Sequence, residues 1–237
     1  MLDIIFSKRV ICLNWYRQFM MKIFIFLFIS LFLSSGYAVE PEIDLDLGEE
    51  INQVCAGCHG EYGEGGKDGE YPRLAGLPAD YIAAQIKLFK EEKRKNMPMR
   101  PYANDRELPD EDIPSIAVLL SQIQLTSKMP QFDETVSAYE KLLIAKRVFN
   151  IPKLEGDIEL GEELYVDDCQ LCHGKNGAGK DDSDTPPLAG QYTQYMTKQI
   201  LQFANGERWH EYAEELFSEM EPEEIQAIMA YLSIMDD

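Results

Sequence analysis

Apolar residues recur at helical spacing near the end of each half of the chain. Ile113, Ile116, Ala117, Leu120 and Ile123 follow an i, i+3, i+4, i+7, i+10 pattern, and five apolar positions between 225 and 235 repeat it. One face of an α-helix presents such a series of residues. The pattern predicts two equivalent helices over 112–124 and 222–234. Because Pro114 suits only the first turn of a helix, we expect the earlier one to begin between Asp110 and Asp112.

Two further pairs of helices are predicted from the same kind of pattern. They are expected over 47–56 and 158–168, and over 79–92 and 191–205. In each half, a polar, glycine-rich loop that ends in Pro-x-Leu-Ala-Gly separates the first of these helices from the second. No stretch alternates as a strand does, so the predicted fold class is all-α.

The halves are copies of one unit. Shifting the sequence by 114 positions matches Gly63 with Gly177, Pro72 with Pro186 and Leu74-Ala75-Gly76 with 188–190. Such self-similarity indicates a tandem duplication. We expect a first domain at 39–127, a connector at 128–155 and a second domain at 156–237. Residues 133–149 of the connector are predicted to be helical, and the connector as a whole is expected to be ordered and packed on one or both domains.

The N-terminal segment has the features of an export signal. Met21-Lys22 opens a short charged region, Ile23–Phe32 is almost wholly apolar, and small residues surround a possible cleavage point after Ala38. The apolar run is short for a membrane span, so cleavage is expected rather than an uncleaved anchor. Residues 1–38 are therefore predicted to be a leader, and the mature protein to be periplasmic.

The chain is strongly acidic, with 42 acidic and 22 basic residues and a formal net charge of −20. This charge argues against nucleic acid and anionic lipid surfaces as partners. Contact with a membrane is expected only through redox complexes or an uncleaved leader. The acidity favours docking to basic surfaces of redox partner proteins. It can equally serve only to keep the protein soluble.

Two copies of Cys-x-x-Cys-His supply the chemistry: Cys55-Ala-Gly-Cys58-His59 and Cys169-Gln-Leu-Cys172-His173. This spacing is the attachment signature of c-type haem, in which two thiols bind the porphyrin covalently and the adjacent His binds its iron. The sequence therefore predicts two covalently attached haems with His59 and His173 as iron ligands. The fifth cysteine, Cys12, lies in the leader, so the mature chain has no thiol left for another role.

With these motifs, the chain resembles the two-haem class I cytochromes c of the cytochrome c4 type over nearly all of the mature sequence. The resemblance implies two all-α domains whose haems lie near the domain interface and which carry electrons between periplasmic or membrane partners. It also implies that backbone carbonyls near Pro72 and Pro186 accept hydrogen bonds from the haem-ligating histidines. Related architecture serves as the cytochrome subunit of flavin-containing sulfide dehydrogenases.

The resemblance further implies a Met ligand on the other side of each iron. In the first half the family's Met-x-x-x-Ala spacing selects Met99, with Met97 as the second choice. The equivalent stretch of the second half has no Met. His210 lies beside the position of Met97 and is the only His outside the two motifs. We therefore expect His173/His210 ligation, with an open sixth position as the alternative.

Two arginines are candidates for neutralising the haem propionates, because a guanidinium group matches a carboxylate. They are Arg94 and Arg208, which are equivalent in the repeat; the alternative is a solvated helix end for each. Tyr81, Gln85 and their counterparts Tyr195 and Gln199 are expected to line the haem or the domain interface, or simply to pack.

The sequence thus predicts a non-enzymatic electron carrier with a high-potential His/Met haem and a low-potential His/His haem. One alternative is a haem enzyme, either a peroxidase or a thiosulfate-oxidising cytochrome, which needs an open iron. A cysteine-ligated thiosulfate enzyme is disfavoured because no spare thiol remains. The other alternative is the cytochrome subunit of a sulfide-oxidising flavoprotein complex.

Overall fold

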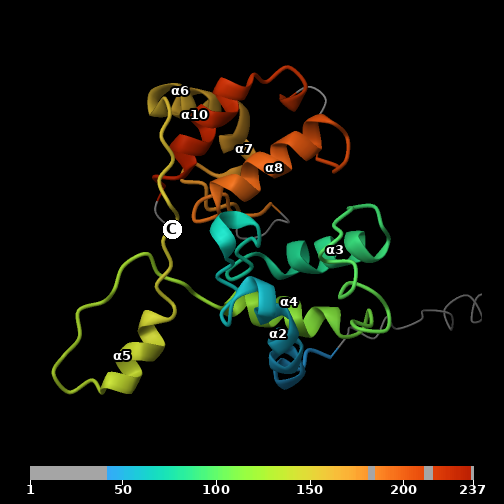
Figure 1. The fold of residues 1–237 in the computed structure, drawn as a ribbon, viewed down its shortest axis with the longest axis vertical. Coiled ribbons are helices and arrows are strands. Elements are labelled where there is room, and N and C mark those ends of the chain that lie inside the picture. The colour runs from blue at the N-terminus through green and yellow to red at the C-terminus, as the bar shows by residue number, and fades with distance from the viewer. Residues whose placement is uncertain (1–41, 181–184, 211–215, 236–237) are drawn as a thin grey trace, which may run out of the picture. The chain divides into compact units, whose positions relative to one another are not determined.

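The computed structural model describes residues 42–180, 185–210 and 216–235 of the 237-residue chain. Within these ranges the regular structure is helical, and extended pairing is limited to two isolated bridges, Gly66–Tyr71 and Thr126–Val148. The predicted all-α class is confirmed (Figure 1). None of the helices in these ranges combines the length and apolar character needed to cross a bilayer. The predicted leader lies outside the described residues.

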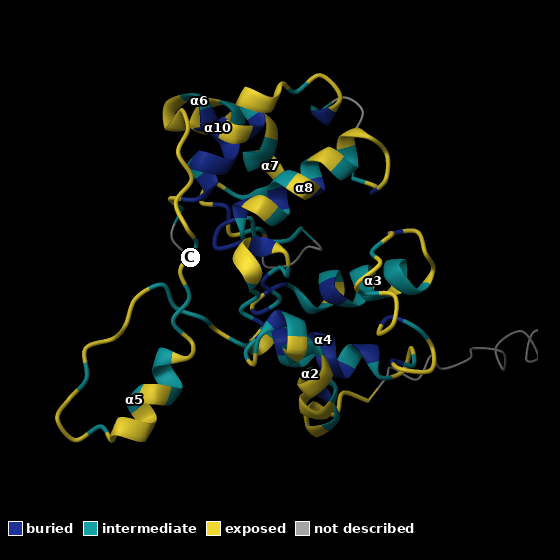
Figure 2. Cartoon of the chain, viewed as in Figure 1, coloured by how far each residue is buried: buried dark blue, intermediate teal, exposed yellow. Residues whose placement is uncertain are grey.

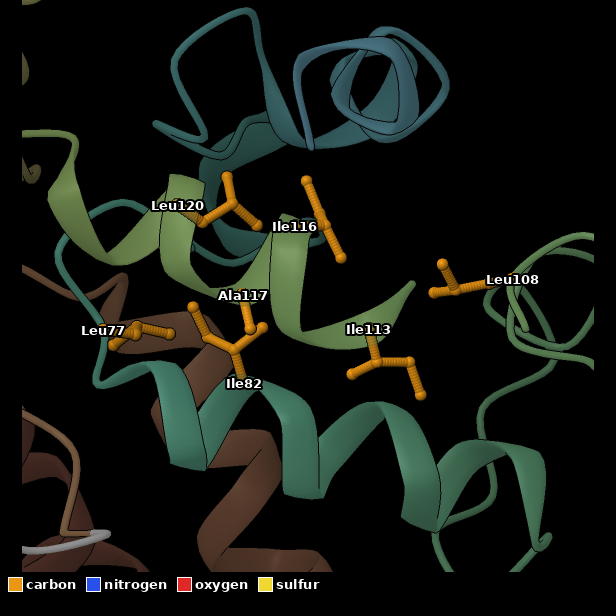
Figure 3. Packing of buried hydrophobic residues seen from close by; sticks show 7 residues of the cluster. All are labelled: Leu77, Ile82, Leu108, Ile113, Ile116, Ala117 and Leu120. Atoms are coloured by element: carbon orange, nitrogen blue, oxygen red, sulfur yellow. The ribbon is translucent and has the colours of Figure 1, made fainter. Parts of the chain in front are cut away.

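Three helices build the first half: α2 (Leu45–His59), α3 (Ala79–Lys90) and α4 (Ile113–Gln122). A short 3-10 turn, η1 (Lys67–Gly69), lies in the loop after α2. Helix α4 packs against both α2 and α3 because its apolar face is buried between them (Figure 3). The cluster that it forms consists of Leu77, Ile82, Leu108, Ile113, Ile116, Ala117 and Leu120.

Helix α4 begins at Ile113 rather than at 110–112 as predicted. Pro114 does lie in its first turn, as predicted. The preceding residues form a separate turn, in which the Asp112 amide donates to the Pro109 carbonyl at 3.1 Å. The helix therefore starts only after this turn has ended.

The second half contains α6 (Ile158–Leu164), α7 (Gln170–His173), α8 (Thr193–Ala204) and α10 (Pro222–Leu232). Helix α10 packs against α6 and α8, so it takes the place that α4 has in the first half. The buried cluster consists of Tyr165, Met196, Ile225, Ile228, Met229 and Leu232.

The first helix of the second half is not the continuous helix predicted over 158–168. It is interrupted by a π turn, η2 (Tyr165–Cys169). In the first half, by contrast, α2 continues as a regular helix into its haem motif. The helix-capping residues Asp44 and Asp157 lie 113 positions apart, whereas the motif cysteines lie 114 apart. One additional residue therefore lies between cap and motif, and a π turn is how a helix accommodates such an insertion.

The connector is helical over α5 (Ala138–Ala145) only, which is shorter than the predicted 133–149. Ser137 and Glu140 cap its start reciprocally. None of its residues is fully buried, and Tyr139 and Leu142 are exposed (Figure 2). The α5 helix itself therefore contributes little buried surface to the packing of the connector.

The end of the connector is fastened to both halves. The Phe149 amide donates to the Thr126 carbonyl at 2.8 Å, which ties the connector to the last residues of the first domain. Lys146 pairs with Glu61 of the first half at 2.7 Å. The Phe149 ring meets Tyr192 of the second half edge to face, with centroids 5.3 Å apart.

Candidate functional site

A cavity of about 1750 Å³ is lined by residues of both halves, including both Cys-x-x-Cys-His motifs. Pockets for a single small ligand usually measure about 300–1,000 Å³. The walls are largely apolar side chains from the helices and from the loops that follow them. The cavity therefore has room for two large apolar groups within one enclosure.

Each motif histidine stands at the C-terminal end of a helix and is oriented by a carbonyl. His59 Nδ1 lies 3.0 Å from the Pro72 carbonyl oxygen, and His173 Nδ1 lies 2.9 Å from that of Pro186. In the tautomer that donates from Nδ1, the Nε2 lone pair is left to bind a metal. Burial lowers the pKa of both histidines against the opposing effect of these hydrogen bonds, and so favours the neutral imidazole that ligates metals.

The loop after each histidine brings the proline back to it. Gly60 ends α2 with φ of 83°, a conformation that L side chains rarely adopt. The Gly65 amide then donates to the His59 carbonyl at 2.7 Å, and the Gly63 carbonyl accepts from Leu74 at 2.7 Å. The second half repeats these contacts 114 positions later. The shared glycines thus explain why both prolines reach their histidines.

All four motif cysteines line the same cavity. Burial raises the pKa of Cys55, and burial followed by the charge of Asp168 raises that of Cys169 to about 12. A reactive catalytic cysteine requires the thiolate instead. Cys172 is exposed, so the second attachment point lies at the rim of the cavity.

The two Met candidates of the first half differ in exposure and in backbone contacts. Both line the cavity, but Met97 is 73% exposed whereas Met99 is only partly exposed. The Met99 carbonyl accepts a hydrogen bond from Ala103 at 2.9 Å, and Ala103 is buried. This contact fixes the backbone at Met99. The Met-x-x-x-Ala spacing thus corresponds to one hydrogen-bonded turn between Met99 and Ala103.

In the second half the His210 ring faces that of His173. Their centroids are 6.4 Å apart and their planes differ by 24°. An ion held between two imidazoles with metal–nitrogen bonds of about 2 Å would place ring centroids about 6 Å apart. Phe203 and Phe217 flank His210, with centroids 4.8 and 5.1 Å from its own. Met220 is half-buried, packs against the hydrophobic cluster and also lines the cavity.

Arg94 and Arg208 are buried where the halves meet, so the alternative of a solvated helix end is wrong for both. Each arginine reaches across to the other half. Arg94 donates to Tyr195 at 2.8 Å and to Gln199 at 2.9 Å, and Arg208 donates to Tyr81 at 2.8 Å. The side chains thus form a cluster that follows the repeat, with three from each half. Its members are Tyr81, Gln85, Arg94, Tyr195, Gln199 and Arg208.

This cluster holds two cations that share neutral acceptors. Gln85 Oε1 accepts from Arg94 at 2.7 Å and from Arg208 at 3.2 Å, and Gln199 Oε1 accepts from both as well. Among the described residues, the hydrogen-bond partners of both guanidinium groups are amide and phenol oxygens. Two buried like charges without carboxylates call for anions nearby. Haem propionates would supply them, and both arginines line the cavity.

A second contact between the halves was not predicted from the sequence. The Gln191 side chain accepts from the Arg73 amide and donates to its carbonyl, both at 2.9 Å, and the Arg73 guanidinium donates to the Ala189 carbonyl at 3.2 Å. The available signal was a break in the repeat, because Pro187 occupies the position equivalent to Arg73. These hydrogen bonds hold the proline loop of the first half against that of the second.

Two duplicated helical units, paired attachment motifs and a shared apolar cavity define a two-haem class I cytochrome c. The sequence profile of the cytochrome c family matches residues 45–124 and 158–236. The chain belongs to this family, and it is a two-haem electron carrier of the cytochrome c4 type.

Individual relatives are similar over most of the chain. A "Thiosulfate dehydrogenase electron acceptor" of Stutzerimonas stutzeri (strain A1501) is 31% identical over 76% of this chain and 78% of its own. A cytochrome c4 of Thiocapsa roseopersicina is 32% identical over 71% and 79%. The crystal structure of reduced cytochrome c4 from Pseudomonas stutzeri shares the fold, with a TM-score of 0.64 and 22% identity over 82% of this chain and 100% of that one.

Proposed function

We propose that this protein is an exported, periplasmic electron carrier whose two haems differ in ligation and potential. His59 and Met99 bind the iron of the first haem, and His173 and His210 bind that of the second. The facing pair of imidazoles in the second half is the observation that carries this proposal. Covalent attachment is through Cys55 and Cys58 in the first half and Cys169 and Cys172 in the second.

The residues of the chain set the direction of transfer. A thioether ligand raises the potential of a haem relative to a second imidazole, so the first haem is the better acceptor. The Pro72 and Pro186 carbonyls orient the ligating imidazoles and increase their basicity. Arg94 and Arg208 hold the propionates where the halves meet. Because residues of both motifs line one cavity, the two haems they would hold would lie within the same apolar surroundings.

The partner class is suggested by the relatives. Proteins of the kind found in Stutzerimonas stutzeri are named as electron acceptors of thiosulfate dehydrogenase. We propose that this chain likewise receives electrons from a sulfur-oxidising enzyme and delivers them to a further redox protein. In this role it performs no substrate chemistry of its own, in keeping with a second iron that has two histidine ligands.

Near-infrared magnetic circular dichroism of the oxidised holoprotein tests the ligand assignment. One His/Met signature and one His/His signature are expected, and the His210→Ala variant should lose only the second. Met99→Ala should lose only the first, whereas Met97→Ala should leave both in place. A high-spin second haem in the wild-type protein would contradict the proposal and favour the enzyme alternative.

A further inference from the structure

One peptide group of the first half connects a motif histidine to a side chain of the second half. The carbonyl oxygen of the peptide between Pro72 and Arg73 lies 3.0 Å from His59 Nδ1, and the amide of the same peptide donates to Gln191 Oε1 at 2.9 Å. Gln191 Nε2 in turn donates to the Arg73 carbonyl at 2.9 Å. The Gln191 side chain therefore holds Arg73 by both of its backbone polar groups and fixes the plane of the peptide that orients His59.

These hydrogen bonds are shielded from water. Gln191 and Arg73 are each only 6% exposed. The neighbouring Tyr192 covers the first-half loop so closely that a Cβ added at Gly65 or Gly69 would lie 2.7 Å from one of its atoms. Inside such a region of low dielectric, hydrogen bonds strengthen and successive bonds polarise one another.

The donation to Gln191 consequently affects the other end of the same peptide. An amide whose N–H is hydrogen-bonded in a buried chain has a more strongly polarised carbonyl. The Pro72 carbonyl therefore becomes a stronger acceptor for the Nδ1 proton of His59.

The second half has no equivalent of this arrangement. Pro187 occupies the position of Arg73 and has no N–H to donate. Leu77 occupies the position of Gln191, and its apolar side chain is buried in the hydrophobic cluster of the first half. The backbone itself is the same at both positions, because the amides of Leu77 and Gln191 each donate three residues back at 3.2 Å. The two side-chain differences therefore make the contact act in one direction only, from the second half on the first.

We propose that Gln191 is a positioning residue for the first haem, although it belongs to the second half. It holds and polarises the peptide between Pro72 and Arg73, and through that peptide it adjusts His59. The inference rests on the proposed function, since His59 acts here as an iron ligand. The second half thereby sets part of the potential of the haem in the first.

The direction of this effect follows from the basicity of the ligand. A stronger acceptor at Nδ1 makes His59 a more basic ligand. A more basic ligand favours the oxidised iron, and hydrogen bonding around the ligands is one of the ways in which a protein tunes haem potential. Gln191 therefore lowers the potential of the first haem and leaves that of the second unaffected.

Potentiometric titration of the full-length holoprotein tests this role. Gln191→Met is neutral and of similar length, but it has neither the amide acceptor nor the amide donor. It should raise the midpoint potential of the first haem only. The equilibrium constant for electron transfer from the second haem to the first should increase about threefold. This change corresponds to about 30 mV, because a tenfold change in a one-electron equilibrium corresponds to about 59 mV.

Proton NMR of the reduced holoprotein reports on the hydrogen bond directly. Gln191→Met should move the Nδ1 proton of His59 upfield, as expected for a weaker hydrogen bond, and leave that of His173 in place. Gln191→Glu offers the Arg73 amide a carboxylate, which is a stronger acceptor, so it should move the His59 proton downfield. Because the two shifts have opposite signs, either variant alone tests the proposal if the other does not fold.

Phe149→Leu is the matched control for a loosened contact between the halves. The Phe149 ring meets that of Tyr192 with centroids 5.3 Å apart, and its centroid lies 5.9 Å from the Arg73 guanidinium carbon. Its replacement weakens packing at the same junction and removes no hydrogen bond from the peptide between Pro72 and Arg73. Both midpoint potentials and both Nδ1 protons should keep their wild-type values.

Three results would overturn the role of Gln191. The first is an unchanged potential of the first haem and an unchanged His59 proton in the Gln191 variants that fold. The second is an equal shift of both haems. The third is the same shift in Phe149→Leu, which would assign it to the loosened junction. Failure of the proposed function is a different result, namely a wild-type protein with a high-spin iron or with two equal potentials.

Discussion

The two halves agree on one side of the haem and differ on the other. On the attachment side, the glycine-rich loop, the proline carbonyl and the histidine repeat within 0.1 Å in the key hydrogen bonds, 3.0 Å at His59 and 2.9 Å at His173. On the ligand side, a basic loop with Met99 faces an acidic loop with His210. Covalent attachment fixes three points of the backbone at once, whereas a sixth ligand needs only one atom in place. The ligand side was therefore free to diverge after duplication.

This difference separates what duplication provides from what it leaves open. Two identical sites would exchange electrons without a preferred direction. On our proposal, different ligands and oppositely charged neighbouring segments would give each site its own potential and its own partner. The cluster of Arg94 and Arg208 keeps the symmetry of the repeat because it must hold both halves together.

Exchanging the ligands across the halves should have the largest effect. His210→Met should raise the midpoint potential of the second haem by on the order of 0.1 V, within the roughly 0.8 V that axial ligands can span. Replacement of the second imidazole by a thioether favours the reduced iron. Potentiometric titration followed by the visible absorbance of the haems measures the change.

Met99→His is the reciprocal variant and should lower the potential of the first haem by a similar amount. The double variant should invert the order of the two potentials. Unchanged potentials in both single variants would mean that neither residue binds iron, and would remove the asymmetry on which the direction of transfer rests.

Loss of one interface cation should have the next largest effect. Arg94→Gln removes hydrogen bonds to Tyr195, Gln199 and Gln85, and on our proposal it also removes the counterion of a haem propionate. Hydrogen bonds to charged groups contribute about 1.5–3 kcal/mol each, so the free energy of unfolding of the holoprotein should fall by about 2–3 kcal/mol. Urea unfolding followed by the Soret band measures it.

Arg106→Gln is the control for this change. The Arg106 side chain is 86% exposed and pairs with Glu107 at the surface, so its loss should change stability by less than about 0.5 kcal/mol. Arg208→Gln should match Arg94→Gln, because the cluster is symmetric. A large difference between the two arginine variants would contradict a shared role.

Adding a methyl group where the first and last helices of a half pack together should destabilise the two halves to different extents. A Cβ at Gly48 would lie 2.8 Å from the Ser115 carbonyl oxygen, but one at Gly161 would lie 2.0 Å from that of Ala227. Overpacking a tight contact costs about 1–3 kcal/mol. Gly161→Ala should therefore lower the thermal midpoint more than Gly48→Ala. Equal midpoints would show that the π turn lets α6 move away from α10. Gly57→Ala, at a glycine with no atom near its added Cβ, is the control.

The repeated features could be predicted from the sequence because each rests on local chemistry. Helical periodicity located α3, α4, α8 and α10, and the attachment motif located both haem sites. The resemblance to a known family supplied the proline carbonyls. Each of these features is determined by residues that are close together in the sequence.

The remainder depended on contacts between distant residues. The π turn of η2 follows from one inserted residue, which becomes visible only when Asp44 is matched with Asp157 at a spacing of 113. The burial of Arg94 depends on acceptors more than 100 positions away, such as Tyr195 and Gln199. The exposure of α5 could not be inferred either. Its apolar residues have the helical spacing of a buried face, but none of them is buried against another part of the structure.

Each half has a side-chain hydrogen bond to the loop that follows its attachment motif, and this clamp differs between the halves. Its loss should have the smallest effect on stability. Tyr165 is fully buried, and its hydroxyl donates to the Gly174 carbonyl at 2.6 Å. In the first half, Asn52 donates to the Glu61 carbonyl at 3.0 Å in an exposed position. Tyr165→Phe should lower the free energy of unfolding by about 1 kcal/mol at pH 7, and Asn52→Ala by less, because a buried hydrogen bond contributes more than a solvated one.

The stability effects of Tyr165→Phe and Asn52→Ala should also differ in how they depend on alkaline pH. Burial raises the pKa of Tyr165 from 10 to about 12, so the native protein binds the phenolic proton more tightly than the unfolded chain does. The resulting stability is present below pH 10 and is lost as pH rises toward 12. The stability difference between wild type and Tyr165→Phe, from urea unfolding at pH 7, 9 and 11, should be constant up to pH 9 and smaller at pH 11. The Asn52→Ala difference should stay level throughout, and a parallel decline there would place the pH effect outside the Tyr165 clamp.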